Sequence, residues 1–380
     1  MFPAASRFLF CFGLGALALP LFAADAADRR AVPSRPGASM AATSAATVPG
    51  KKISGVEHVS LTDVAKRLGL KLAWLERGKR LRLSDPTVRM ELENDSREIL
   101  VDGLRVFLGE RVVDAGGHLF VTRMDFDRCI APLLRPGFGR PPLQKPRVIA
   151  LDAGHGGDDP GMESKTLGLK ESALTLDVVL RLKKLLERDG YQIVLTRTDD
   201  KALAADKRKD LTLRAAKANR AGADLLVSVH FNSLFPDTKT GGTEVFAYTA
   251  RGQRSDQSWG FGQPDDRERD AMPVNRHDAW STVLALRVQR AVLEKLKTTD
   301  RGFKTKHLLL FQDLNCPAVL IESLFLSNET EARRAATPES RQQIAEALAT
   351  GIRDYASLVE ARAPAAPSAK AAPAERRSAG

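Results

Sequence analysis

The stretch RVIALDAGHGG, from Arg147 to Gly157, decides how we interpret the rest of this 380-residue chain. Its apolar run, Val148 to Leu151, is bounded by Pro146 and by glycines, a pattern typical of a short buried strand. The run leads into Asp-Ala-Gly-His-Gly-Gly, which places the imidazole of His155 at the carboxyl end of that strand. Open α/β sheets bind ligands at this edge. The stretch therefore predicts an α/β sheet with a functional loop around His155.

Strand and helix patterns alternate after this stretch. The apolar spacing predicts helices over residues 171–188, 211–220, 282–296 and 341–358, and strands over 192–196, 224–230, 243–248 and 318–322. We therefore predict an α/β domain over residues 147–359, with a mixed, largely parallel sheet flanked by helices.

A smaller α/β domain is predicted over residues 53–134. Ser60 is a suitable N-cap for a helix that Gly69 ends. Short strand-like runs follow at 71–75, 80–83, 88–92, 98–101, 105–108 and 119–122. This pattern resembles the copper amine oxidase N-terminal-like stalk domain of bacterial envelope proteins, which implies a spacer or wall-binding role. Residues 135–146, rich in proline, are predicted to form a stiff junction to the larger domain.

Both ends of the chain have compositions typical of segments outside a fold. Residues 1–26 have the pattern of a secretory signal peptide, with Arg7, an apolar run from Phe8 to Leu21, and small residues after it. The run is short for a membrane span, and an uncleaved anchor is the alternative. Residues 27–52 and 360–380 are predicted to be a disordered linker and a disordered Ala/Pro-rich tail. We therefore expect a periplasmic or secreted protein without a membrane span after signal cleavage.

The charge and cysteine content narrow the class of partner. A formal net charge of +11 suits nucleic acid, anionic lipid or an anionic cell-wall polymer. Aromatic residues make up only 6% and are not interleaved with a basic run, which argues against nucleic acid. Once the signal is removed, Cys129 and Cys316 remain, one in each predicted domain, so the chain is not a disulfide scaffold.

Three of the predicted strands lead into a residue able to do chemistry. The first leads to His155, the second ends at His230 and the third ends at Glu322, while Glu171 begins the helix that follows the first loop. A parallel arrangement brings all four to one edge of the sheet. Two imidazoles and a carboxylate form a zinc ligand set that leaves a position open. A second carboxylate nearby supplies the general base and acid of metal-assisted hydrolysis.

Each of these residues also has a simpler interpretation. A histidine at a strand end is usually an ordinary polar residue, Glu171 suits a helix N-terminus, and Glu322 could be an ion-pair partner. The glycines around His155 could form a phosphate-cradling loop, but no GK[ST] follows them and Asp158 and Asp159 would repel phosphate. A non-haem iron site uses similar ligands.

Residues from about 147 to 359 resemble the zinc-dependent N-acetylmuramoyl-L-alanine amidases of the Amidase_3 family. The matching segments occur in the family's order: DAGHGGDDPG from Asp152, LKES from Leu169, LTRTDD from Leu195, LRAAKANRAGAD from Leu213, VSVHFNS from Val227, DRGFK from Asp300 and CPAVLIESLFLSN from Cys316. The resemblance implies that His155, Glu171 and His230 bind one zinc ion. It also implies that Glu322 is the catalytic carboxylate.

The same resemblance implies a substrate and a reaction. The family hydrolyses peptidoglycan at the amide between the lactyl group of N-acetylmuramic acid and L-alanine of the stem peptide. The expected role is cell-wall remodelling or daughter-cell separation, with peptidoglycan as partner and an activator protein considered as a second one. The alternatives are a zinc peptidase acting on stem peptides and a catalytically inactive wall-binding protein.

Three further side chains are given weaker roles. Asn232, just past His230, is predicted to orient the substrate or the zinc ligands, or else to form a turn. Arg214 and Asn219 are predicted to hold their helix against the sheet.

A charged, irregular insertion lies between Thr249 and Trp280. Some family members carry an autoinhibitory helix in this part of the chain. We therefore hypothesise a lid over the zinc, with Glu268 as a blocking ligand. A surface loop is the alternative.

Overall fold

One long sheet organises the part of the chain that the computed structural model describes, residues 48–140, 143–164, 167–258, 265–267 and 270–362. Its eleven strands lie in the order β13-β10-β14-β17-β15-β16-β7-β6-β5-β4-β3. The strands of the larger domain are β10 (Val148–Ala153), β13 (Gln192–Leu195), β14 (Leu225–Asn232), β15 (Thr243–Tyr248), β16 (Asp300–Lys306) and β17 (Ala318–Phe325). The first four in the sheet order are parallel and β15 is antiparallel to β17, which confirms the predicted mixed, largely parallel sheet.

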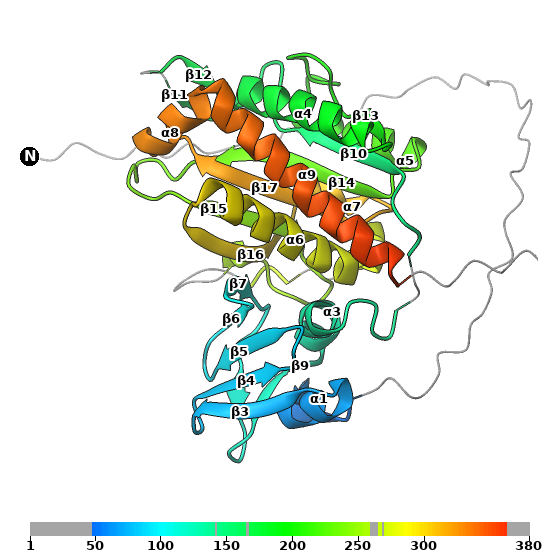
Figure 1. The fold of residues 1–380 in the computed structure, drawn as a ribbon, viewed down its shortest axis with the longest axis vertical. Helices are drawn as coiled ribbons and strands as arrows, with labels where there is room; N and C mark the ends of the chain where they lie inside the picture. Colours follow the sequence, from blue (N-terminus) through cyan, green and yellow to red (C-terminus); the bar gives the residue numbers. More distant parts are fainter. Residues whose placement is uncertain (1–47, 141–142, 165–166, 259–264, 268–269, 363–380) are drawn as a thin grey trace, which may run out of the picture. The chain divides into compact units, whose positions relative to one another are not determined.

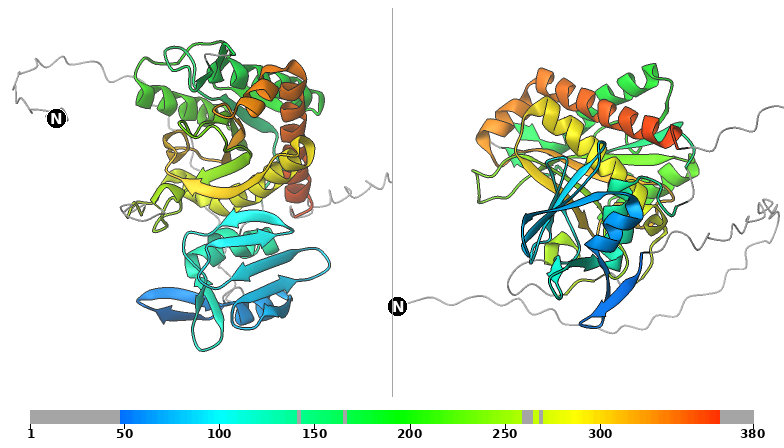
Figure 2. Two further views of the ribbon diagram at one scale, coloured as in Figure 1. Left: turned by 90° about the vertical axis from the view of Figure 1, so that its left-hand side faces the viewer. Right: turned by 60° about the horizontal axis from the view of Figure 1, so that its bottom comes forward.

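Helices cover both faces of this sheet. The long helices α4 (Glu171–Arg188), α6 (Asp278–Leu296) and α9 (Pro338–Glu360) pack on one face, where α6 and α9 run side by side (Figures 1 and 2). The shorter helices α5 (Lys207–Arg220) and α7 (Leu309–Gln312) pack on the other. A further helix, α8 (Glu329–Ala336), precedes α9, and the short strands β11 (Glu163–Ser164) and β12 (Leu169–Lys170) form a small hairpin before α4.

The alternation of side chains along the strands assigns each residue to one of the two faces. Val227 and Val229 of β14 lie in the core under α4, α6 and α9. Leu226 packs instead with Ala215 of α5. His230 has the same parity as Leu226, so it faces the side covered by α5 and α7.

The smaller domain consists of one helix, antiparallel strands and a short helical segment. Helix α1 (Leu61–Leu68) begins where the Ser60 hydroxyl accepts a hydrogen bond from Thr62 N, and ends at Gly69 with a φ of 65°. Its strands are β1 (Gly50–Ile53), β2 (Val56–Ser60), β3 (Lys71–Glu76), β4 (Arg80–Ser84), β5 (Arg89–Glu93), β6 (Glu98–Val101), β7 (Leu104–Phe107), β8 (Val113–Asp114) and β9 (Leu119–Thr122). The chain then continues through α2 (Arg123–Asp125), a π-helical turn (Phe126–Ile130) and α3 (Ala131–Leu134).

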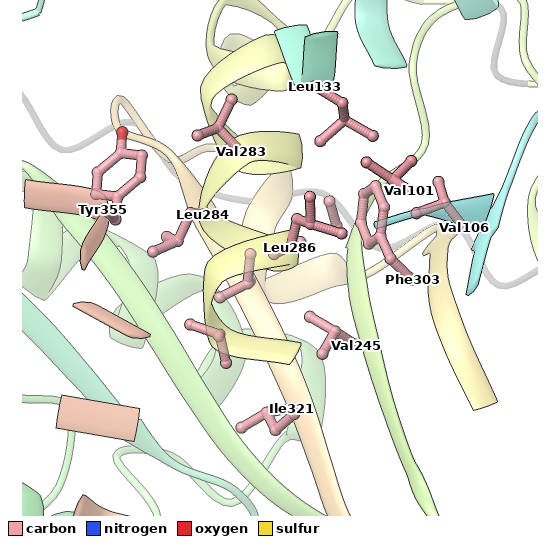
Figure 3. Packing of buried hydrophobic residues seen from close by; sticks show 14 of the residues in the cluster. Val101, Val106, Leu133, Val245, Val283, Leu284, Leu286, Phe303, Ile321 and Tyr355 are labelled. Carbon is pink, nitrogen blue, oxygen red and sulfur yellow. The ribbon is translucent and has the colours of Figure 1, made fainter. Parts of the chain in front are cut away.

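Strands β3 to β7 extend the large sheet, while β1, β2, β9 and β8 form a sheet of their own. The two domains share a sheet because β7 pairs in parallel with β16, through Val106 and Phe303. Figure 3 shows Val101 and Val106 of the smaller domain in one apolar cluster with Phe303 and Leu286. Asp300 joins the domains further, since its carboxylate accepts a hydrogen bond from the backbone N–H of Arg105 at 2.8 Å. The sequence had predicted a small domain joined to the larger one by a stiff junction. In the structure, buried apolar residues of both domains form one cluster.

Most elements have the predicted positions, with differences at their ends. Strand β1 begins at Gly50, so regular structure starts inside the range 27–52 that was predicted as a disordered linker. The strands predicted over 224–230 and 318–322 extend to Asn232 and Phe325. Strand β16 was not predicted as a strand, because its sequence DRGFKTK is mostly polar.

Several predictions fall partly or wholly on residues outside the described ranges. These are the signal peptide (1–26), most of the 27–52 linker, and the tail from residue 363. Among the described residues, no helix is long and apolar enough to cross a membrane. Cys129 and Cys316 are both buried free cysteines and form no disulfide with each other.

Candidate metal centre and active site

The loop after β10 holds His155 in a backbone conformation that non-glycine residues seldom adopt. The φ of His155 is 62°, in the left-handed region, and Gly156 follows with a φ of 123°. A β-bridge between Gly156 and Asp159 closes the turn. The side chain of His155 is thereby turned from the strand direction toward the start of α4.

Two buried arginines fix the carbonyl groups of this loop. Arg197 donates hydrogen bonds to the carbonyl oxygens of Ala153 and Gly154, at 2.8 and 2.9 Å. Arg214 donates to those of Ala153 and His155, at 2.8 and 2.7 Å. Three successive carbonyl groups are therefore bound by two planar guanidinium groups, whose donors have a fixed geometry.

Asp152 supplies the negative charge that this pair of arginines requires. It is 1% exposed, and its carboxylate accepts hydrogen bonds from Thr196 and Ser228, both at 2.6 Å, and from Arg214 at 3.0 Å. Burial by itself would raise the pKa of Asp152, but Arg214 and the two hydroxyl groups hold that pKa below its usual range. Asp152 thus stays ionised and anchors Arg214 under the loop. Its role, and that of Arg197, was missed from the sequence.

Glu171 is the first residue of α4 and lies at the centre of the site. Its Oε2 accepts a hydrogen bond from Met162 N at 2.9 Å, and its Oε1 accepts one from Phe231 N at 3.1 Å. The same Oε1 lies 3.0 Å from His155 Nε2 and 3.1 Å from His230 Nδ1. Burial favours the protonated acid, but the two imidazoles hold the pKa of Glu171 well below its usual range.

The three residues predicted as zinc ligands therefore come together, with one donor atom from each lying within 4.8 Å of the others. Two imidazole nitrogens and a largely buried carboxylate oxygen form a donor set that zinc prefers. Glycines keep the space around them open: a Cβ at Gly154 would lie 2.3 Å from the His230 ring, and one at Gly161 would lie 2.5 Å from Glu171 Oε2. The residues present thus fit a bound metal ion.

Asp159 orients the first histidine and was not assigned this role from the sequence. Its Oδ1 lies 3.1 Å from Nδ1 of His155, and its Oδ2 lies 2.9 Å from Lys207 Nζ. A carboxylate at Nδ1 favours the tautomer with the proton on that nitrogen, which leaves the lone pair of Nε2 directed at the cluster. Metal-binding histidines commonly have such a second partner.

Glu322 lies beside the cluster on β17. It is the register partner of His230 on the adjacent parallel strand. Its Oε2 is covered and has no hydrogen-bond partner among the described residues. Burial raises the pKa of Glu322 to about 7; His230 opposes this rise and Glu171 adds to it. A carboxyl group with such a pKa can both accept and donate a proton near neutral pH.

The side chain of Asn232 contacts protein groups. Its amide donates to Glu244 Oε1, and its Oδ1 accepts a hydrogen bond from Ser233 N at 2.8 Å. Glu244 was not singled out from the sequence, yet it is the register partner of Glu322 on β15 and forms an ion pair with Lys304 at 2.7 Å. Asn232 is the last residue of β14, and its predicted roles in a turn or in orienting the zinc ligands stay predictions. Its direct role toward substrate stays a prediction.

The predictions for Arg214 and Asn219 have different outcomes. Arg214 does link α5 to the sheet through Asp152, but it also supports the His155 loop. The prediction for Asn219 was wrong: its side chain bonds to the backbone of Asp313 and Asn315, in the loop after α7, at 2.7 and 3.0 Å. Asn219 lies near the end of α5, beyond the reach of the sheet residues that Arg214 contacts.

A pocket opens beside the two histidines. His155 and His230 line one side of it, and Leu211 of α5 and the segment Leu308–Phe311 line the other. Charged and apolar walls thus meet at the proposed ligands, an arrangement typical of sites that bind organic substrates.

The described parts of the insertion pack beside the pocket and against the smaller domain; Val274 shares an apolar cluster with the pocket residues Leu310 and Phe311. Its 3₁₀ turns are Asp256–Ser258 and Pro273–His277. Asp256 forms an ion pair with Arg97 at 2.9 Å, and Arg267 forms one with Glu110 at 2.5 Å, so this segment contacts the smaller domain. None of its described residues lines the pocket. Glu268, the hypothesised blocking ligand, lies outside the described residues.

Comparisons with known proteins show the family of the larger domain. The model of the N-acetylmuramoyl-L-alanine amidase family Amidase_3 matches residues 149–354, which is more than half of the chain and includes all four predicted site residues. The amidase AmiC of Escherichia coli O6:H1 is 29% identical over 250 residues, which cover 61% of this chain and 58% of AmiC. The amidase AmiC of Neisseria meningitidis is 30% identical over 239 residues, covering 58% of this chain and 55% of that protein. This chain thus spans little more than half the length of these relatives.

Solved structures are also similar. The N-acetylmuramoyl-L-alanine amidase from Clostridium difficile 630 is 29% identical, with a TM-score of 0.45, over 56% of this chain and 98% of that one.

Proposed function

The chain belongs to the N-acetylmuramoyl-L-alanine amidase family, and on this premise we propose that it hydrolyses the amide bond between N-acetylmuramic acid and L-alanine of the peptidoglycan stem peptide. The observation that carries the proposal is the convergence of His155, Glu171 and His230 within 4.8 Å, with Glu322 opposite His230 on the next strand. This arrangement has the parts that metal-assisted hydrolysis of an amide requires.

His155 Nε2, His230 Nδ1 and the carboxylate of Glu171 would hold a zinc ion. When bound, zinc supplies Lewis acidity toward water and toward a carbonyl oxygen. Asp159 keeps the proton of His155 on Nδ1, so that Nε2 remains a donor. The backbone N–H groups of Met162 and Phe231 hold the Glu171 carboxylate in place.

Glu322 carries the proton transfers. Its Oε2 takes a proton from the attacking water while the oxygen of that water forms a bond to the scissile carbonyl carbon. The C–N bond then breaks, and Oε2 returns the proton to the leaving amine of L-alanine. One water is consumed, and the products are the lactyl carboxylate and a free amino group. The raised pKa of Glu322 suits a group that must both accept and release a proton.

The setting in which the reaction takes place is part of the proposal. An enzyme on this substrate acts in the cell envelope, periplasmic or secreted, which agrees with the signal-like pattern of residues 1–26. Peptidoglycan is the proposed partner, and an activator protein is a second proposed one. We also propose that residues 53–134 are a domain of the copper amine oxidase N-terminal-like type, supported by helix α1 and the antiparallel strands that follow it.

Product analysis tests the reaction. Purified sacculi are incubated with the full-length protein, and soluble products are identified by mass spectrometry. We expect free stem peptides with an L-alanine amino terminus, and Glu322→Gln should reduce their release at least about 1,000-fold without loss of bound zinc. Cleavage within the stem peptide would indicate the zinc peptidase instead, and binding without products would indicate the wall-binding protein.

A further inference from the structure

A second pocket, which we call the arginine pocket, lies between the smaller domain and the ends of α6 and α9. Its lining residues are Arg67, Leu68, Arg135, Pro136, Gly137, Phe138, Arg140, Trp280 and Arg362. Four of the nine are arginines and two are aromatic, while none is acidic. The proposed amidase mechanism makes no use of any of these residues.

Only one of the four guanidinium groups is paired with a carboxylate, and two have no polar partner among the described residues. Arg135 is paired with Asp85, and Arg140 donates to the carbonyl oxygen of Asp127 at 3.0 Å. In contrast, the side chains of Arg67 and Arg362 have no hydrogen bond or ion pair within the described ranges. Arg67 only lies over the ring of Phe138, at 5.8 Å from its centroid.

Two further arginines, Arg128 and Arg287, lie near the pocket, and their charges are partly balanced because Arg128 is paired with Asp278 at 3.1 Å and Asp354 lies near Arg287. Burial lowers the pKa of Arg140 and the neighbouring Arg128 lowers it further, although Asp127 and Asp278 oppose them. Burial also lowers the pKa of Arg287; the charges of Arg290 and Arg362 contribute in the same direction, and Asp354 and Asp102 oppose them. Convergent like charges repel each other, and a bound anion would relieve that repulsion.

The arginine pocket also has an apolar wall. Trp280 is 4% exposed and fixed by an edge-on contact with Tyr355. The backbone at Gly137 passes close to both Trp280 and Arg362: a Cβ there would lie 3.8 and 3.7 Å from them. A ligand with a charged group and a carbon skeleton would therefore meet guanidinium groups and an aromatic edge in the same pocket.

We propose that the arginine pocket binds a phosphate group carried on a sugar or polyol chain. A phosphate monoester has a charge of roughly −1.5 to −2 at pH 7 and three acceptor oxygens, which suit several guanidinium groups at once. A carboxylate has one charge and two oxygens, which a single bidentate arginine satisfies.

The arginine pocket lies on the sheet face covered by α6 and α9, whereas the two histidines line a pocket on the face covered by α5 and α7. A polymer held at the arginine pocket therefore leaves the cleavage site free. In a cell envelope, a phosphate-bearing polymer bound there would keep the enzyme on the wall between cleavage events. This role rests on the proposed function, but phosphate binding itself does not.

Chromatography on two charged celluloses tests the proposal with a matched control. The full-length protein, a pocket variant (Arg67→Gln with Arg362→Gln) and a control variant (Arg188→Gln with Arg220→Gln) are loaded on phosphocellulose and on carboxymethyl cellulose. All four arginines are exposed, and both variants lose two positive charges, so non-specific charge effects are equal. Melting temperatures verify that the variants are folded.

We expect the pocket variant to elute from phosphocellulose at a clearly lower salt concentration than the control variant, and the two variants to elute together from carboxymethyl cellulose. Glucose 6-phosphate should compete with phosphocellulose for the wild type. The proposal is overturned if the two variants elute together from phosphocellulose, or if they separate only on carboxymethyl cellulose, which would indicate a carboxylate site. Hydrolysis of a small soluble muropeptide is measured in parallel and should be the same in both variants, so that failure of the amidase function is detected separately.

Discussion

The guanidinium group of Arg214 donates a 2.7 Å hydrogen bond to the backbone carbonyl oxygen of His155, the residue whose imidazole we assign to zinc. Its other donors bind Asp152 and Asp210 at 3.0 and 2.8 Å. Through Arg214, helix α5 thus supports the backbone of the His155 loop without contributing a metal ligand. By binding the carbonyl oxygen of His155, Arg214 restrains the left-handed backbone conformation of that residue.

Replacement of Arg214 by lysine tests this support. A lysine keeps the charge but cannot form the forked contacts to Asp152, Asp210 and the loop. We expect a zinc affinity lower by at least about 10-fold and a loss of roughly 2–4 kcal/mol in the free energy of unfolding, because buried acceptors lose several of their hydrogen bonds. Zinc titration and urea unfolding measure the two effects. Arg220→Lys, at an exposed position of the same helix, is the control, and an equal effect in both variants would contradict the proposed support.

Gly154→Ala should damage the metal site by steric overlap. The added Cβ would lie 2.3 Å from His230 Cε1, so the ring must move away from Glu171. We expect substoichiometric zinc in the purified protein, measured by elemental analysis, and a stability loss of about 1–3 kcal/mol from overpacking. Gly168→Ala is the comparison for zinc occupancy, because a Cβ there meets nothing within 4 Å; its φ of 62° makes this alanine cost about 1 kcal/mol of stability by itself. Full zinc occupancy in Gly154→Ala would show that metal binding does not require the His230 ring to lie this close to the backbone of Gly154.

Asp278 should make stability depend on pH. Burial raises its pKa from 3.8 to about 7, although Arg128 and Asn275 oppose this. Between these two pKa values the folded protein holds a proton that the unfolded chain has released, so stability falls as pH rises from about 4 to 7. Asp278→Asn removes this dependence. Its stability relative to wild type should therefore rise with pH, by up to roughly 4 kcal/mol.

Urea unfolding of wild type and Asp278→Asn at pH 5 and pH 8 measures the predicted change. Asp313→Asn, at an exposed site, serves as control and should show the same difference from wild type at both pH values. A constant difference between Asp278→Asn and wild type would refute the assignment.

Asp300→Ala should uncouple the two domains. It removes the acceptor for Arg105 N, Gln289 Nε2 and Gly302 N, which bond to the Asp300 carboxylate at 2.8, 2.6 and 2.8 Å. Donors left without an acceptor at this part-buried contact between the two domains should lower the free energy of unfolding by roughly 2–4 kcal/mol. Calorimetry should then resolve two transitions where wild type has one.

The control for this experiment is Asp102→Asn, which weakens an exposed contact of Asp102 with Arg290, also between the two domains. Surface ion pairs contribute about 0–1 kcal/mol, so a single transition should persist. Two transitions already in wild type would show that the domains are independent despite the paired strands.

The sequence by itself allowed the fold class and the ligand set to be predicted. Residue patterns with periods of two and 3.6 mark β10, β14, β17 and α4, because buried faces of strands and helices must be apolar. The same patterns place His155 just after β10, His230 and Glu322 in the carboxyl-terminal halves of β14 and β17, and Glu171 at the start of α4. Local rules were sufficient here because each of these residues lies in, or shortly after, an element that its own sequence pattern marks.

Only the tertiary structure decided what supports that site and how the domains meet. Asp152, Arg197 and Arg214 are distant in sequence, and their hydrogen bonds exist only once β10, β14 and α5 are packed. Strand β16 is mostly polar, so no hydrophobic period marks it, and it becomes a strand because β15 and β7 supply its backbone partners. Contacts between separate elements determine these features, and a pattern within one element carries no information about them.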